Sequence, residues 1–278
     1  MFAGRKLLIV TKHGKEKVLA PVLEQALGVS CIVAEGFNTD LLGTFTGEVE
    51  RKDDALSTLR RKCQEGLSAL GYDLAVASEG SFGPHPSVFF SAGDDELVML
   101  VDKQNSLEIV AREISLDTNF NGAEIYGPHQ LEEFLGPACF PSHAVILRRK
   151  RNSSEGIVKG ITDRGALERL SLDYLARYGS YYIETDMRAM YNPKRMDVIA
   201  KAAEKLAQKI SARCPNCGQP GFGVTQGRSG LPCQLCGSAT ASTLSHIYCC
   251  AGCNYSEEKL YPNGRKTQEP MYCDYCNP

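Results

Sequence analysis

Four Cys-x-x-Cys pairs near the end of the chain constrain its folding more than any other feature. Of twelve cysteines in 278 residues, three are scattered before residue 213 and nine follow it. The pairs are Cys214 with Cys217, Cys233 with Cys236, Cys250 with Cys253, and Cys273 with Cys276. A tight turn aims two thiolates at one ion, and two such turns complete a tetrahedral site. The spacing therefore predicts two structural Zn²⁺ sites rather than a disulfide framework.

The distances between the pairs bear on how they combine. Fifteen residues separate the first two pairs, and nineteen separate the last two. Both lengths suit a β-hairpin, so we predict that the pairs combine in sequence order into a double zinc ribbon. A crossed pairing is the other arrangement that the spacing allows. Cys249 is left over, and we expect it not to bind metal.

Composition and charge are those of an ordinary globular protein. Hydrophobic residues make up 43% of the chain, and the net charge is −2. No apolar run reaches the length of about 18 residues that a membrane span needs. The N-terminus has no small-residue cleavage site, so we interpret it as the first strand and not as a signal peptide. We therefore expect a cytoplasmic protein without a membrane partner.

The charge of the cysteine-rich segment argues against nucleic acid as its main partner. Residues 211–278 contain five basic and four acidic side chains. Eight thiolates binding two Zn²⁺ ions add four negative charges, so few counterions would be released on binding DNA or RNA. We favour a structural cap or a protein-contact surface, whose folding energy the metal supplies.

The chain before the cysteines alternates between short apolar runs and amphipathic helices. We expect strands at 6–11, 30–34, 74–78, 96–102, 107–114, 143–147, 156–161 and 181–185, and helices at 13–27, 53–70, 129–135, 163–178 and 192–212. This order predicts the α/β class, a layered mixed sheet with flanking helices. We place an α/β domain at 1–212 and a double zinc ribbon at 213–278.

The stretch ASEGSFGPHP, residues 77–86, is the first candidate for chemistry. It follows an apolar run, so we expect a strand to end there and a loop to begin. Ligands bind at the carboxyl ends of strands in open α/β sheets. Glu79 would bind a metal or act as a base, and Ser81 and His85 would donate hydrogen bonds to substrate. The alternative is a glycine-rich structural turn.

A second candidate directly follows the first strand. Residues 11–17, TKHGKEK, lead into a helix N-terminus, which is a natural anion site. Lys12, His13, Lys15 and Lys17 would bind phosphate there. The GxxxxGK[ST] spacing of a P-loop is absent. An exposed, charged first helical turn is the alternative.

A third candidate lies near residue 186. On a strand, Glu184 and Asp186 point to one face about 7 Å apart, which suits a Mg²⁺ ion held partly through water. Arg188 and Arg195 would clamp a phosphate or carboxylate. A surface salt-bridge cluster is the alternative. Asn192, before a proline, is expected to cap the last helix.

Weaker signals lie elsewhere. Polar side chains in residues 38–48 could form an active-site wall, namely Asp40, Thr44, Thr46 and Glu48. Cys139 and His143 could form a nucleophilic pair, although a buried cysteine is the favoured interpretation. Two basic features could form a nucleic-acid patch but are better explained as solvated surface: residues 148–151 and a row of Lys201, Lys205, Lys209 and Arg213.

Several of these motifs together resemble an uncharacterised bacterial family known only as a domain of unknown function. The resemblance covers nearly the whole chain but implies no activity. It rests on HGKEK at 13–17, LGTFTGE at 42–48, SEGSFGPHP at 78–86, PSH at 141–143, ETDMR at 184–188 and the cysteine pairs.

The N-terminal half also resembles the nucleoside triphosphate pyrophosphatases of the inosine triphosphatase type. That family opens with a strand, a Thr/Ser-x-Asn-x-x-Lys phosphate motif and a helix. Here His13 stands in place of the asparagine, and Lys15 and Lys17 flank the lysine position. Glu48 and Glu79 fall roughly where the family's metal-binding acids occur. The likeness implies a similar architecture.

These observations lead to one function and one alternative. We expect an enzyme that hydrolyses phosphate or pyrophosphate groups of a phosphorylated small molecule, a nucleotide, with Mg²⁺. Its catalytic residues would be Glu79, Glu184 and Asp186. The alternative is a non-catalytic adaptor that binds protein or nucleic acid through the zinc ribbons.

Overall fold

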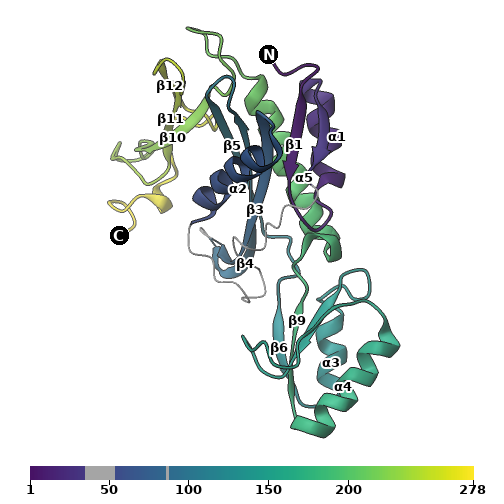
Figure 1. Cartoon of the computed structure of the whole chain (residues 1–278). Helices are drawn as coiled ribbons and strands as arrows, with labels where there is room; N and C mark the ends of the chain where they lie inside the picture. The colour runs from purple at the N-terminus through teal and green to yellow at the C-terminus, as the bar shows by residue number, and fades with distance from the viewer. Residues whose placement is uncertain (35–53, 86–87) are drawn as a thin grey trace. The chain divides into compact units, whose positions relative to one another are not determined.

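The computed structural model describes residues 1–34, 54–85 and 88–278, and it divides into two compact units (Figure 1). Unit 1 comprises Met1–Ala207 and unit 2 comprises Gln208–Pro278, so the division falls inside the last long helix. In the part of the chain that the structure describes, no helix combines the length and apolarity that a membrane crossing requires.

A five-stranded mixed sheet forms the first half of unit 1. Its strands, in spatial order, are β2 (Ser30–Val33), β1 (Lys6–Val10), β3 (Leu74–His85), β4 (Val88–Asp102) and β5 (Leu107–Ser115). The strands β2, β1 and β3 are parallel, whereas β4 and β5 add as antiparallel hairpins. The α/β class with a mixed sheet is thus confirmed.

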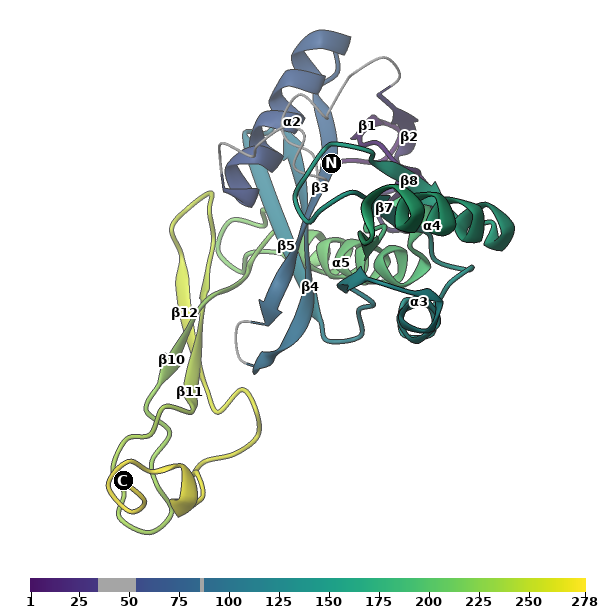
Figure 2. The same cartoon turned by 90° about the horizontal axis from the view of Figure 1, so that it is seen from below.

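Helices cover both faces of this sheet. Helix α2 (Ala55–Leu70) packs on one face, whereas α1 (Glu16–Leu27) and α5 (Pro193–Ser211) lie on the other (Figures 1 and 2). The strands are buried on both sides, as their nearly continuous apolar sequences require. Asp54 caps α2 by accepting the N–H groups of Leu56 and Ser57, and Gly71 ends it in the left-handed conformation.

A four-stranded antiparallel sheet forms the second half of unit 1. Its strands, in spatial order, are β6 (Gly122–Ile125), β9 (Tyr181–Thr185), β7 (Val145–Arg148) and β8 (Val158–Ile161). Helices α3 (Pro128–Leu135) and α4 (Arg164–Tyr178) contribute to its core, which includes Leu131, Leu167 and Tyr181. Asn192 caps α5 as predicted, because its side-chain oxygen accepts the N–H of Arg195 at 3.1 Å.

The prediction that a strand ends at Ser78 is wrong. Strand β3 continues to His85 and pairs with β4 along its whole length. Glycine and proline usually mark a turn, but here tertiary pairing overrides that preference. Glu79 and Ser81 therefore lie on a long antiparallel hairpin and not in a loop at the end of a strand.

Unit 2 is a three-stranded antiparallel sheet with cysteine turns at its ends. Strands β10 (Gly223–Ser229), β11 (Thr243–Cys249) and β12 (Ser256–Leu260) form a meander in sequence order. Most side chains of β10 and β12 are exposed. Such a sheet has little core of its own, so the segment depends on other interactions for stability.

Candidate functional site

The eight paired cysteines form two four-cysteine metal-binding sites in unit 2. The first tetrad consists of Cys214, Cys217, Cys250 and Cys253, and the second of Cys233, Cys236, Cys273 and Cys276. Sulfur atoms from different pairs lie 3.6–3.9 Å apart. A tetrahedron with Zn–S bonds of about 2.3 Å requires S···S separations of roughly 3.8 Å. The tetrads thus fit two structural zinc ions.

The predicted pairing in sequence order is wrong, because alternate pairs combine. The physical reason is the meander, in which each strand carries the chain to the opposite end of the sheet. The pair before β10 meets the pair after β11, as the bridge between Gly223 and Cys249 shows. The pairs that follow β10 and β12 meet at the other end. Cys249 lies outside both tetrads, and its sulfur is 3.3 Å from the Thr225 hydroxyl.

In unit 1, residues 77–85 of the first candidate carry charged and polar groups on two faces of the sheet. The Glu79 carboxylate is buried on the α2 face and forms an ion pair with Lys62 of that helix. Ser78, Gly80 and Phe82 alternate with it and point to the opposite face. Ser81 is exposed and His85 is half-buried. Because Glu79, Ser81 and His85 are spread along one strand, they do not converge on a loop as expected.

A buried charged cluster occupies the opposite face. Lys15, between β1 and α1, donates to the Ser78 hydroxyl at 3.1 Å. On β4, Glu96 accepts a hydrogen bond from Nε of Arg195 at 2.6 Å. Asp94 lies two residues before Glu96 and therefore shares its face. These ionisable side chains all belong to residues that are less than a tenth exposed.

Burial changes the proton affinity of two members of this cluster. Desolvation, with the nearby Arg195 charge, lowers the pKa of Lys15 to about 7. Desolvation and the adjacent Glu96 carboxylate raise the pKa of Asp94 to about 8. One oxygen of Asp94 and one of Glu96 have no hydrogen-bond donor among the described residues. Perturbed groups of this kind are frequent at functional sites, although ion-pair networks in cores produce them too.

The third predicted candidate lies where β9 ends. Arg148 of β7 pairs with the Glu184 carboxylate, and burial raises the pKa of Glu184. The fully buried Asp186 carboxylate accepts hydrogen bonds from the Arg188 guanidinium, at 2.6 Å, and from the backbone N–H of Gly160. Glu184 and Asp186 thus each form an ion pair with a different arginine.

These contacts bear on the expected Mg²⁺ ion. A magnesium site needs carboxylate oxygens that are free to face the ion, whereas Glu79, Glu184 and Asp186 are each held by Lys62, Arg148 or Arg188. Within residues 1–34, 54–85 and 88–278, the cysteine tetrads are the only groups of three or more side chains placed to share a metal. The donor set present therefore does not fit Mg²⁺.

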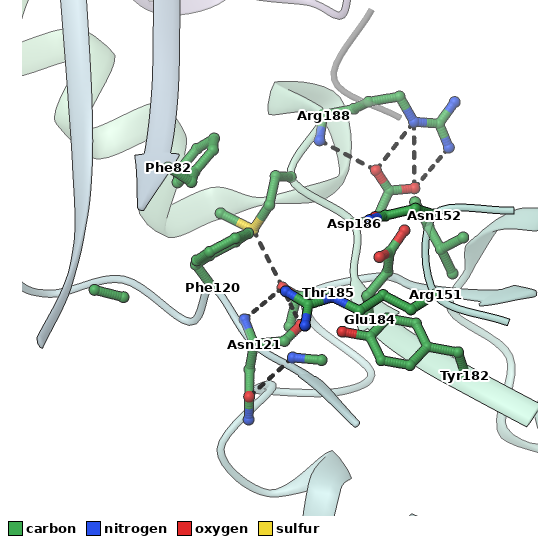
Figure 3. Close-up of a pocket in the computed structure, with 14 residues that line it drawn as sticks. Phe82, Phe120, Asn121, Arg151, Asn152, Tyr182, Glu184, Thr185, Asp186 and Arg188 are labelled. Atoms are coloured by element: carbon green, nitrogen blue, oxygen red, sulfur yellow. Dashed lines mark hydrogen bonds and ion pairs between the residues drawn. The ribbon is translucent and has the colours of Figure 1, made fainter. Parts of the chain in front are cut away.

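A pocket of about 460 Å³ in unit 1 brings part of the first and third candidates together (Figure 3). Phe82 and Phe120 stack in its wall, with ring centroids 5.6 Å apart. Tyr182, Glu184, Asp186, Arg188, Arg151 and Asn121 also line it. The pocket thus combines aromatic rings, guanidinium groups and a carboxylate with a raised pKa.

Several predicted site residues lie elsewhere. Lys12 and His13 are half-buried, Lys17 is exposed, and none of the three lines this pocket. Arg195 does not clamp a ligand but is fully buried against Glu96. The suggested active-site wall of Asp40, Thr44, Thr46 and Glu48 lies outside the described residues.

The Cys139 and His143 side chains do not form a nucleophilic pair. The ring of His143 accepts the backbone N–H of Lys194 and lies 3.0 Å from the Ser142 hydroxyl. The Cys139 thiol is directed at the backbone oxygen of Pro137. His143 therefore contributes to the start of α5, and the cysteine is not activated by it.

Sequence reasoning missed Lys62, Asp94 and Glu96. A signal for Lys62 was present, because it lies beside Cys63 in a helix whose buried positions include Leu59 and Gly66. The acids at 94–96 directly precede the apolar run LVMLV, which places charge at the buried end of a strand. Their partners come from distant segments, and no local pattern indicates those.

The fold and the cysteine sites define an α/β protein that carries a C-terminal module with two four-cysteine metal sites. The chain belongs to the family described as a domain of unknown function, DUF6671, whose model matches residues 62–278. No curated protein matches the sequence. The matched region includes Glu79, the pocket and both tetrads, whereas Lys15 precedes it.

Proposed function

We propose that unit 1 binds a nucleotide and hydrolyses its phosphate or pyrophosphate groups. The observation that carries this proposal is the composition of the pocket, which offers stacked aromatic rings and guanidinium groups in one cavity. A ligand that matches both features is planar at one end and anionic at the other. A nucleotide has that chemistry.

The aromatic residues would hold the base. Phe82 and Phe120 already stack on each other, and Tyr182 adds a third ring to the lining. Stacking on aromatic side chains is worth about 1–3 kcal/mol per base and tolerates different bases. Asn121 offers an amide to the base edge or the ribose.

The guanidinium groups would bind the phosphates. Arg151 is exposed at the pocket, and Arg188 is held in place by Asp186 and stacks over the Tyr191 ring, 4.6 Å from its centroid. A guanidinium fixed in this way loses little entropy when it binds a phosphate. Lys15 is buried against Ser78 and does not line the pocket, so it is not one of these groups.

The carboxylate of Glu184 would accept a proton from the attacking water. Glu184 lines the pocket, and its raised pKa brings it closer to the range that suits a general base. Glu79 does not line the pocket, because it is paired with Lys62 on the face of β3 opposite to Phe82.

The experiment measures phosphate and pyrophosphate release from nucleoside mono-, di- and triphosphates by the zinc-loaded full chain, with and without Mg²⁺ or Mn²⁺. We expect Glu184→Gln to lower turnover at least about 100-fold, the usual share of a general base. Glu155→Gln is the matched control, because Glu155 forms an exposed pair with Arg149.

Binding is tested separately from turnover. Arg151→Met should weaken nucleotide binding, and Arg177→Met, which alters an exposed pair on α4, should not. If folded protein neither binds nor hydrolyses any nucleotide of the panel, the proposal is wrong. If it hydrolyses nucleotides and Glu184→Gln keeps full turnover, the assignment of the base is wrong.

A further inference from the structure

The second tetrad is surrounded by large apolar side chains that face solvent. Leu235 and Tyr275 are 74% and 79% exposed, and Met271 and Tyr272 are 59% and 55% exposed. Three of these residues directly precede a cysteine of the tetrad, and Met271 is two residues before Cys273. The four side chains therefore lie around one metal site, and we call them the tip patch.

Comparison of the two tetrads indicates that the arrangement of the four sulfur atoms does not depend on these residues. Each Cys-x-x-Cys turn has one residue directly before its second cysteine. In the first tetrad these residues are Asn216 and Gly252, and in the second they are Leu235 and Tyr275. Both tetrads hold their sulfur atoms at similar separations. The apolar side chains thus serve a purpose other than shaping the turn.

The first tetrad also shows what aromatic residues do when they support a metal site. Phe222, Tyr248 and Tyr255 pack with its cysteines in a small core, and the Phe222 ring lies within 6 Å of both tyrosine rings. The rings of Tyr272 and Tyr275 are instead more than half exposed. Tyrosine, methionine and leucine side chains presented in this way are typical of a protein-binding surface.

The charge around the tip patch indicates the kind of partner. A zinc ion bound by four thiolates has a formal charge of −2. Asp274 lies inside one turn and Glu269 lies four residues before Cys273, and both are exposed. Together they outweigh Arg265 and Lys266 of the preceding loop. The phosphates of a nucleic acid or an anionic membrane would be repelled, whereas basic side chains would be attracted.

We propose that the tip patch binds a protein segment that presents apolar side chains flanked by lysine or arginine. The apolar side chains of the segment would cover Leu235 and Tyr275, and its cations would face Asp274, Glu269 and the metal centre. The residues that exclude a nucleic-acid partner by charge thus favour a basic peptide. This role is independent of the nucleotide pocket in unit 1.

The test uses a zinc-loaded full chain in which the second tetrad receives the turn residues of the first. Leu235→Asn combined with Tyr275→Gly should retain two zinc ions, because the first tetrad binds with those residues. The probe is a fluorescein-labelled amphipathic helix of leucine and lysine, compared with a leucine and glutamate helix of the same apolar face. Leu172→Asn is the control, since Leu172 is 63% exposed on α4.

We expect the leucine and lysine helix to bind the parent chain, and the double variant to bind it at least about tenfold more weakly, as loss of interface hot spots implies. The Leu172 variant should bind like the parent. Equal binding by the double variant, or a preference for the glutamate helix or for single-stranded RNA, would overturn the proposal. A dimer of the parent that dissociates in the double variant would instead identify a second copy as the occupant.

Discussion

The Nε atom of Arg195, in the first turn of α5, lies 2.6 Å from Oε1 of Glu96 on β4, and both side chains are fully buried. Arg195 also donates to the backbone oxygen of Met187, just after β9, and its guanidinium lies over the Phe82 ring. One buried side chain thus links the five-stranded sheet to the segment that lines the pocket.

Removal of either charge of this pair should destabilise the protein strongly. We expect Glu96→Gln or Arg195→Met to lower the free energy of unfolding by about 3–5 kcal/mol, because the remaining charge stays buried without compensation. Urea unfolding measures the change. Lys205→Met is the control, since Lys205 pairs with Glu113 while half exposed, and such pairs contribute at most about 1 kcal/mol. If Lys205→Met lowered the free energy of unfolding as much as the variants of the buried pair, this interpretation would be contradicted.

Gly80 should not tolerate a methyl group, whereas Gly83 should. A Cβ atom at Gly80 would lie 2.2 Å from a Glu96 carboxylate oxygen, but one at Gly83 would have no atom within 4 Å. Gly80→Ala therefore forces Glu96 away from Arg195, and we expect a loss of about 1–3 kcal/mol in unfolding free energy. Thermal and urea unfolding of Gly80→Ala beside Gly83→Ala check this. A neutral Gly80→Ala would show that Glu96 can move freely.

The Asp94 carboxyl should make stability depend on pH. Its pKa is raised from 3.8 to about 8 by burial and by Glu96, against the opposing charges of Arg195 and Lys15. Between these pH values the folded chain keeps a proton that the unfolded chain has lost, so the contribution of Asp94 to stability falls as the pH rises.

Asp94→Asn isolates this effect. Urea unfolding at several pH values should show the parent losing stability relative to the variant as the pH rises from 3.8 to about 8. Asp95→Asn is the control, because Asp95 is partly exposed and pairs with Arg112. A difference between parent and Asp94→Asn that stays constant over this range would refute the raised pKa.

The crossed pairing of the cysteines can be tested by zinc content. Cys217→Ala with Cys250→Ala removes two ligands from the first tetrad only, so one of the two zinc ions should remain. Cys217→Ala with Cys236→Ala removes one ligand from each tetrad and should weaken both sites. Pairing in sequence order predicts the opposite result. Zinc per chain after dialysis, measured by atomic emission, distinguishes the two arrangements.

Local patterns predicted the elements of unit 1 well where caps and periodicity agreed. The ends of α2 at Asp54 and Gly71 and the span of β9 follow from cap residues and alternation. Helix α1 begins at Glu16 and not at His13, which adopts a positive φ. The extension of β3 through Gly80, Gly83 and Pro84 was not predictable in this way, because it depends on the partner strand β4.

The candidate site was predictable only in part. Glu184, Asp186 and Arg188 were identified from one short segment, and they do line the pocket. Phe82 and Phe120 lie 38 positions apart in the sequence and meet only because the two sheets of unit 1 are folded together. Lys62, Arg148 and Glu96, the partners of Glu79, Glu184 and Arg195, likewise come from distant strands and helices, so no local pattern indicated that these charges were already paired.

The sequence by itself determined that eight cysteines bind metal and that the preceding chain forms an α/β fold, because residue type, spacing and hydrophobic period are local properties. Only the tertiary structure decided which cysteines share an ion, since the meander of β10, β11 and β12 sends successive pairs to opposite ends of the sheet. It also decided which charges are buried against one another, because an ion pair depends on distance in space and not on distance along the chain.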